Sequence, residues 1–126
     1  GFAADATKFK AKGIHDVVCI TVNDAFVSAA WKEASNVGNN VRILADPSAV
    51  FTKALGLDVD LTAALGNVRS KRYSAYVENG VIKVLNVEPD GTGLTCSLAP
   101  NLLSQVQFYL LAFLVTALYV ANFEFG

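Results

Sequence analysis

The stretch from Leu102 to Ala121 carries no charged side chain, and its run from Phe108 onward is apolar or aromatic except for Thr116. A helix from Pro100 through Ala121 would be about 33 Å long, which matches the hydrocarbon core of a bilayer. We therefore predict a C-terminal transmembrane-type helix, with a membrane as partner through Leu102 to Ala121. Burial in a protein interface and an artefact of the sequence are the alternatives, although apolarity on all sides does not suit one-sided packing.

Length and charge restrict the class of protein. A chain of 126 residues is long enough for one domain with its own core. The formal net charge of -1 arises from mixed signs, so no nucleic-acid partner is expected. Two cysteines without a secretory signature do not predict a disulfide scaffold. The chain contains no methionine, even at position 1, so we expect a removed leader or a longer polypeptide.

Local patterns predict alternating helices and strands. Four β-branched residues between Asp16 and Val22 indicate a buried strand, and Asn79-Gly80 between two apolar runs indicates a hairpin. The order is α/β and fits most of a thioredoxin-like fold. The predicted elements are a helix over residues 2–12, a strand over 16–22, a helix from Asn23 or Asp24 to about Asn36 with Phe26, Ala29, Ala30 and Trp31 toward the core, a strand over 41–44, short helices over 48–55 and 61–65, hairpin strands over 72–78 and 81–87, and a helix from Pro100.

The run from Asn86 to Pro100 is the most informative motif. It resembles the C-terminal signature of atypical two-cysteine peroxiredoxins, the peroxiredoxin-five subfamily. Residues 22–27, 45–47 and 66–74 also follow that family's order and spacing, so the resemblance extends from Gly1 to about Gln105. It implies a thioredoxin-like (peroxiredoxin) sandwich over residues 1–99 that lacks its N-terminal strands. The hydrophobic helix of residues 100–126 is then an addition that the family does not share.

The resemblance gives roles to two residues. Arg72 matches the family's peroxide-orienting Arg, and its planar fork of donors suits that role; an Arg snorkelling at a strand end is the alternative. Cys96 matches the resolving cysteine in a flexible, Gly-rich loop, although a lone cysteine is more often a buried small hydrophobe. Cys19 is expected to pack in the core. Glu88 and Asp90 flank a turn and are expected to be solvated, and no metal or other cofactor is expected.

The resemblance also leaves a gap. The family's peroxidatic loop, Pro-x-x-x-Thr-x-x-Cys, is absent from the sequence. In the family, the strand before that loop lies between the counterparts of residues 16–22 and 72–78. Without it, two buried strands would each expose unpaired backbone groups. We therefore predict that the position is filled, by a missing N-terminal part of the protein, by a partner's strand or by direct pairing of the two strands.

Three functions follow from these features. The first is a membrane-tethered accessory or structural subunit of a larger membrane complex, because a hydrophobic helix is added and the reactive cysteine is missing. The second is a thiol-dependent peroxidase with its peroxidatic cysteine in a segment outside this sequence, because Arg72 and Cys96 are retained. The third is a thiol sensor that uses Cys96 alone. Expected partners are membrane-complex subunits and a thiol reductant protein, and the expected location is an organellar membrane, in a chloroplast or mitochondrion.

Overall fold

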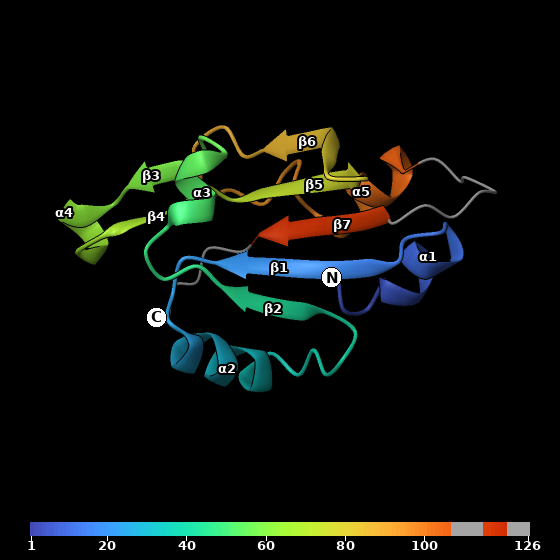
Figure 1. Cartoon of the computed structure of the whole chain (residues 1–126), viewed down its shortest axis with the longest axis horizontal. Coiled ribbons are helices and arrows are strands. Elements are labelled where there is room, and N and C mark those ends of the chain that lie inside the picture. Colours follow the sequence, from blue (N-terminus) through green and yellow to red (C-terminus); the bar gives the residue numbers. More distant parts are fainter. Residues whose placement is uncertain (107–114, 121–126) are drawn as a thin grey trace.

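The computed structural model describes residues 1–106 and, for backbone pairing alone, residues 115–120 (Figure 1). Five strands form one sheet in the order β2-β1-β7-β5-β6, and β3 pairs with β4 in a second, smaller sheet. The predicted α/β organisation is confirmed. The elements are α1 (Ala6–Ala11), β1 (Asp16–Thr21), α2 (Ala25–Ala34), β2 (Arg42–Ala45), α3 (Val50–Ala54), β3 (Asp58–Asp60), α4 (Thr62–Leu65), β4 (Val68–Ser70), β5 (Tyr73–Glu78), β6 (Val81–Val87), α5 (Ala99–Gln105) and β7 (Val115–Val120).

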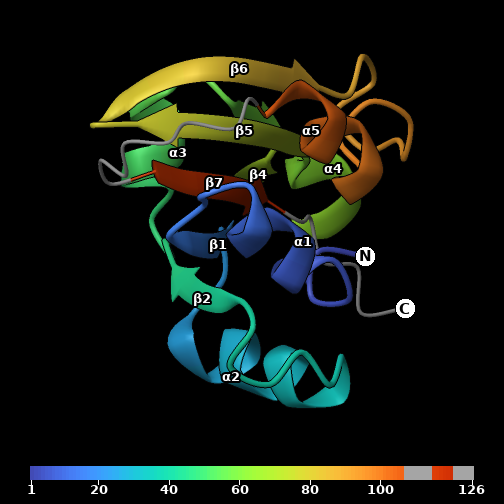
Figure 2. The ribbon, with the colours of Figure 1, turned by 90° about the vertical axis from the view of Figure 1, so that its right-hand side faces the viewer.

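Strand β1 is buried on both faces of the large sheet, as its apolar run predicts. Val17 and Cys19 point into a cluster that includes Phe9 of α1 and Leu102 of α5. The alternate residues Val18 and Ile20 belong to a second cluster, with Leu57, Tyr73 and Ala75. The helices α1 and α5 lie near each other in both ribbon views (Figure 2). They are joined where Lys12 Nζ donates to Leu103 O at 2.6 Å.

Strand β7 occupies the central position between β1 and β5. It runs parallel to β1 and antiparallel to β5, and Leu118 lies opposite both Val18 and Ala75. The prediction that this position is filled is confirmed, but its occupant differs from the three that were expected. The backbone groups of β1 and β5 that would otherwise be unpaired meet a segment of the same chain.

The predicted membrane helix is wrong over this segment. Helix α5 ends at Gln105, Val106 is extended, and residues 115–120 form a strand. An uncharged run of branched and aromatic residues suits a strand buried on both faces as well as a membrane helix, and the free sheet edges favour the strand. Within residues 1–106 and 115–120, no helix has the length and apolar character to span a bilayer. Residues 107–114 and 121 of the predicted helix lie outside the described residues, and the division of the chain between residues 99 and 100 stays a prediction.

Of the four residues of helix α2 that were predicted to face the core, only Trp31 packs against it, where it is half-buried. Asp24 caps the helix as expected, because its side chain accepts a hydrogen bond from Val27 N at 2.8 Å. The buried residue is Ser28, whose hydroxyl is 2.7 Å from that of Thr21 on β1. Phe26 was expected in the core but is 88% exposed. Ala29 and Ala30 were also expected to face the core, but both are exposed.

The hairpin of β5 and β6 positions the functional site. Asn79 and Gly80 adopt positive φ values of 49° and 75°, as a two-residue turn requires, and this prediction is confirmed. At the open end of the hairpin, Tyr73 pairs with Val87. Arg72 directly precedes Tyr73 and Glu88 directly follows Val87, so the pairing brings these two charged residues together.

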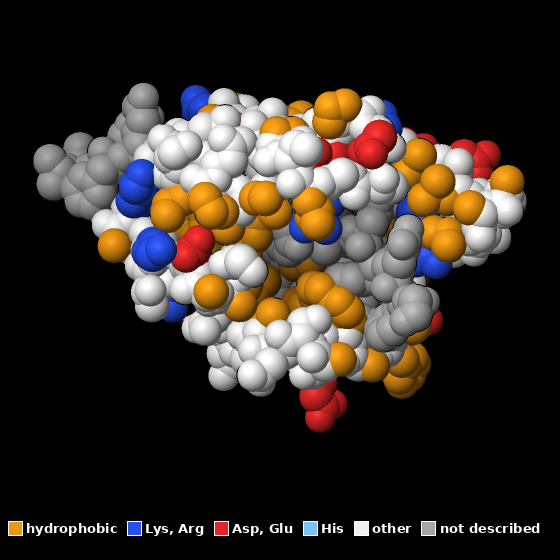
Figure 3. All heavy atoms as spheres, turned by 180° about the vertical axis from the view of Figure 1, so that it is seen from behind, with side chains coloured by type: hydrophobic (Ala, Val, Ile, Leu, Met, Phe, Trp, Pro, Cys, Tyr) orange, Lys and Arg blue, Asp and Glu red, His pale blue; other side chains and the backbone are white. Residues whose placement is uncertain are grey.

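The surface mixes apolar and charged side chains. On the face shown in Figure 3, hydrophobic side chains lie among polar ones, and basic and acidic side chains are interspersed rather than grouped by sign. The most exposed large apolar side chains, besides Phe26, are Val50 at 72% and Leu94 at 60%. Leu94 belongs to the loop that also contains Cys96.

Candidate functional site

Cys96 lies in the loop between β6 and α5, where it is half-buried and has a free thiol. Its Sγ donates to Val87 O, the last carbonyl of β6, at 3.4 Å. Its own carbonyl accepts a hydrogen bond of 2.6 Å from Asn101 Nδ2 on α5. The thiol is therefore tied to the hairpin on one side and to the helix on the other.

Glu88 holds both chain neighbours of Cys96. Its carboxylate accepts hydrogen bonds from Thr95 N at 2.6 Å and Thr95 Oγ1 at 2.5 Å. It also accepts from Ser97 N at 3.0 Å and Ser97 Oγ at 2.7 Å. Only 1% of Glu88 is exposed, so the expectation of a solvated side chain is wrong. A buried carboxylate requires such donors, and here one carboxylate clamps the loop on both sides of the thiol.

These contacts fix the charge of Glu88. Burial alone would raise the pKa of its carboxyl group. The hydrogen bonds from Thr95 and Ser97 favour the ionised form more strongly and lower the pKa from 4.5 to about 2. Glu88 is therefore a carboxylate throughout the neutral range, and the four donors face a full negative charge.

Arg72 joins the same loop through its backbone and its side chain. Its N–H donates to Gly91 O at 2.8 Å, and its carbonyl accepts from Glu88 N at 3.0 Å. Its Nε donates to Ser97 Oγ at 3.3 Å. The structure thus brings together the two residues that the sequence singled out, Arg72 and Cys96, with Ser97 as the link between them.

The first half of the loop is also organised by an acidic side chain. Asp90 Oδ1 accepts from Thr92 N at 2.9 Å and from Gly93 N at 2.7 Å. Gly93 leaves room for this arrangement, because a Cβ there would lie 3.2 Å from oxygens of both Asp90 and Glu88. Asp90 itself is exposed, as expected from the sequence. The Gly-rich loop is thus held by side-chain hydrogen bonds along much of its length.

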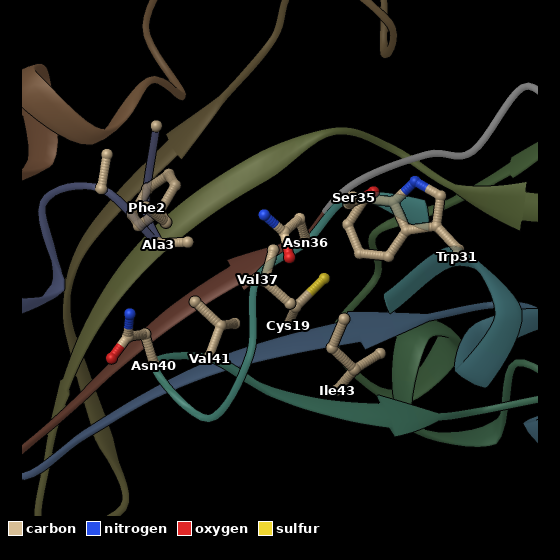
Figure 4. Close-up of a pocket in the computed structure, with 12 residues that line it drawn as sticks. Phe2, Ala3, Cys19, Trp31, Ser35, Asn36, Val37, Asn40, Val41 and Ile43 are labelled. Carbon is tan, nitrogen blue, oxygen red and sulfur yellow. The ribbon is translucent and has the colours of Figure 1, made fainter. Parts of the chain in front are cut away.

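Cys19, the other cysteine, is separate from this site. It is fully buried in β1, so the prediction of core packing is confirmed. It lies at the floor of a pocket of about 520 Å³, together with Trp31, Val41 and Ile43, while Asn36 and other polar residues also line the pocket (Figure 4). None of the residues around Cys96 described above lines this pocket.

The site combines a thiol and a carboxylate from the loop between β6 and α5 with a guanidinium from the residue that precedes β5. A guanidinium can stabilise negative charge that develops on oxygen, and a half-buried thiol in a loop can attack an oxidised sulfur. In the part of the chain that the structure describes, no three His, Cys, Asp or Glu residues are grouped as metal ligands. The sequence did not predict that Glu88 belongs to the site. The one sequence feature that could have indicated a buried carboxylate there is the pair of hydroxyl residues that flank Cys96, Thr95 and Ser97.

The redoxin family model matches residues 2–103 of the chain. The mitochondrial peroxiredoxin-2F of Arabidopsis thaliana is 43% identical over 99 residues, which are 79% of this chain and 49% of the relative. The chloroplastic peroxiredoxin-2E-2 of Oryza sativa subsp. japonica is 44% identical over 101 residues, 77% of this chain and 44% of the relative. The crystal structure of peroxiredoxin 5 from Alvinella pompejana superposes with a TM-score of 0.70 at 40% identity, covering 84% of this chain and 66% of that one. The chain thus spans about half the length of these curated relatives.

These matches correct the first functional hypothesis. A structural accessory subunit of a membrane complex is wrong as the main interpretation, because relatives with 43% and 44% identity are peroxiredoxins. The thiol-dependent peroxidase fits the matches better. The thioredoxin-like fold of the peroxiredoxins, expected from the resemblance, is confirmed by the superposition.

Proposed function

Because this chain belongs to the redoxin family, we propose that it serves in thiol-dependent reduction of hydroperoxides, as an atypical two-cysteine peroxiredoxin. The observation that carries the proposal is the loop around Cys96. A half-buried free thiol lies beside Ser97, and Ser97 accepts a hydrogen bond from Arg72. In such a site the arginine can stabilise charge on the peroxide oxygen, and the thiol can attack the cysteine that the peroxide has oxidised.

Arg72 is the residue that binds the peroxide and favours the thiolate in this proposal. Its side chain is half-buried at the start of β5, and both its backbone groups are fixed by Gly91 and Glu88. A guanidinium on a rigid strand end can present several donors to an oxygen that gains negative charge as the O–O bond breaks.

Cys96 is the resolving thiol. We place the peroxidatic cysteine in a segment outside these 126 residues that carries the family's Pro-x-x-x-Thr-x-x-Cys loop, because Cys19 is fully buried in β1 and separate from the Cys96 site. Since β7 occupies the central position of the sheet, this loop reaches the site without a preceding strand between β1 and β5. Peroxide oxidises that cysteine to a sulfenic acid and leaves as water or alcohol. The Cys96 thiolate then attacks the sulfenic sulfur, an S–S bond forms, the S–O bond breaks and water leaves. A thiol reductant protein reduces the disulfide and restores both thiols.

An organelle is the proposed location. The relatives named above are mitochondrial and chloroplastic by name, and this chain shares 43% and 44% identity with them. Thioredoxin or glutaredoxin is the class of reductant that we propose for the regeneration step.

Turnover of the native polypeptide tests the role of Cys96. Peroxide consumption is measured with thioredoxin, its reductase and NADPH in the unchanged protein, in Cys96→Ser and in Cys19→Ala as a matched control. We expect Cys96→Ser to slow turnover by about tenfold or more, because the thioredoxin-reducible disulfide no longer forms, and Cys19→Ala to turn over normally. Equal turnover by all three proteins would contradict the proposal.

A further inference from the structure

We propose that Glu88 is a positioning residue that latches the Cys96 loop closed, and that opening this latch limits the rate at which the Cys96 thiol reacts. The latch consists of the Glu88 carboxylate and the residues on either side of Cys96, Thr95 and Ser97. The inference concerns access to the thiol itself. The existence of the latch does not depend on the proposed function. Only one consequence does, namely that the latch must open before Cys96 reaches the oxidised cysteine.

Glu88 binds the two residues that lie directly before and after Cys96 in the sequence. Thr95 and Ser97 each donate both a backbone N–H and a hydroxyl group to the one carboxylate. Cys96 cannot move far from β6 while its two neighbours are held, because adjacent Cα atoms are a fixed distance apart. A movement of several ångströms by the thiol therefore requires these bonds to break.

The latch is anchored at a rigid point of the fold. Glu88 follows directly on β6, and its N–H donates to Arg72 O next to the first residue of β5. The closed loop also turns the thiol toward the protein, because Cys96 Sγ donates to Val87 O at 3.4 Å. An electrophile approaching from outside meets a half-buried sulfur whose hydrogen bond points inward.

Ser97 connects the latch to Arg72. Its hydroxyl donates to Glu88 at 2.7 Å and accepts from Arg72 Nε at 3.3 Å. A hydroxyl has one hydrogen to donate, so the Ser97 hydroxyl cannot remain bonded to Glu88 and donate to another acceptor. The guanidinium and the latch therefore share one side chain, and a shift of Arg72 toward a bound ligand removes one of the two bonds that position this hydroxyl.

Alkylation of the reduced native protein tests the latch without any peroxide. The rate at which iodoacetamide modifies Cys96 is followed by peptide mass spectrometry in the unchanged protein, in Glu88→Gln and in Glu33→Gln. Glu33 is exposed on α2, so Glu33→Gln is the matched control for the same chemical change. Rates are compared from about pH 6 to about pH 10, which separates thiolate formation from access to the thiol.

Cys19 provides an internal control in every sample, because it is fully buried and lies in a different part of the fold, so opening of the Cys96 loop alone does not expose it. We expect Glu88→Gln to raise the alkylation rate of Cys96 by about tenfold or more at its high-pH plateau, with Cys19 and Glu33→Gln unchanged. An unchanged Cys96 rate would overturn the proposal.

A second variant covers the case in which Glu88→Gln unfolds. Thr95→Val deletes only one hydroxyl donor at an exposed position, so the fold should be retained. We expect a smaller increase of the Cys96 rate, about two- to fivefold, again without reaction of Cys19. No increase, or a parallel increase of both cysteines in this variant, would overturn the latch. Because no peroxide is used, failure here leaves the resolving role of Cys96 to the turnover experiment.

Discussion

At the scale of single residues, the buried carboxylate of Glu88 connects most of the site. It is bonded to Thr95 and Ser97 on either side of the thiol, and Ser97 is in turn bonded to Arg72. Each of these hydrogen bonds involves a charged group, which makes them stronger than bonds between neutral partners. A reactive loop can therefore be held closed by one side chain and opened by the loss of a few specific contacts.

The pKa of Glu88 predicts how stability changes with pH. Burial would raise this pKa, but the hydrogen bonds from Thr95 and Ser97 lower it from 4.5 to about 2. The unfolded chain therefore binds a proton at a higher pH than the folded chain does. The stability contributed by ionised Glu88 is fully present above pH 4.5 and is lost as the pH falls toward about 2.

Urea unfolding at a series of pH values checks this prediction. We expect the difference in free energy of unfolding between the unchanged protein and Glu88→Gln to be constant near neutral pH. It should shrink as the pH falls from 4.5 to about 2. A difference that stays constant across this range would show that Glu88 titrates normally in the folded protein.

The sequence pointed to Arg72 and Cys96 as candidate site residues, which the structure brings close together through Ser97, but it did not point to the carboxylate of Glu88. Both were assigned by resemblance, because each lies in a recognisable motif. Glu88 stands between a strand and Pro89, a position typical of solvated side chains, and its donors follow seven and nine residues later. No periodic pattern marks a contact that a loop makes by folding back on itself.

At the scale of elements, local signals predicted β1, β2, β5 and β6 but missed β3, β4 and β7, and they predicted the buried face of α2 poorly. Asn79-Gly80 specified the hairpin because its turn needs two residues with positive φ. In α2, apolar spacing placed Phe26 toward the core, but the sheet offers the Thr21 hydroxyl there, and Ser28 pairs with it. The partner across the interface decides which face is buried, and the helix sequence does not contain that information.

The central position of strand β7 predicts slow hydrogen exchange of its backbone. This strand lies between β1 and β5, whereas β6 is at the edge of the sheet. We expect the backbone amides of Val115–Val120 to exchange with deuterium as slowly as those of β1, and the outward-facing amides of β6 to exchange faster. Hydrogen-exchange mass spectrometry resolves these segments. Exchange of residues 115–120 at the rate of an unfolded peptide would contradict their place in the sheet.

At the scale of the whole molecule, the domain is a redoxin sheet completed by a segment distant in the sequence. Local patterns predicted most of the order of helices and strands but not β3, β4 or β7. The need for a central strand followed from the family resemblance and from the expected burial of β1 and β5. The sequence did not show which segment forms that strand, because an uncharged apolar run can form either a membrane helix or a strand buried on both faces. Pairing with β1 and β5 decides between them, and such pairing is non-local.

The completed sheet supports a site in which Arg72 and Cys96 come from its open hairpin end. The proposed chemistry requires that peroxide drive Cys96 into a disulfide with a second cysteine. In the proposal above, the latch formed by Glu88, Thr95 and Ser97 must open before Cys96 reaches that cysteine.

The most direct measurement is the mass of the native polypeptide before and after one equivalent of hydrogen peroxide, with peptide mapping of Cys96. We predict that the oxidised protein has lost two hydrogen atoms and that Cys96 is found in a disulfide with a cysteine of a Pro-x-x-x-Thr-x-x-Cys loop. A protein that consumes the peroxide while Cys96 remains a free thiol would contradict the proposed role of this site.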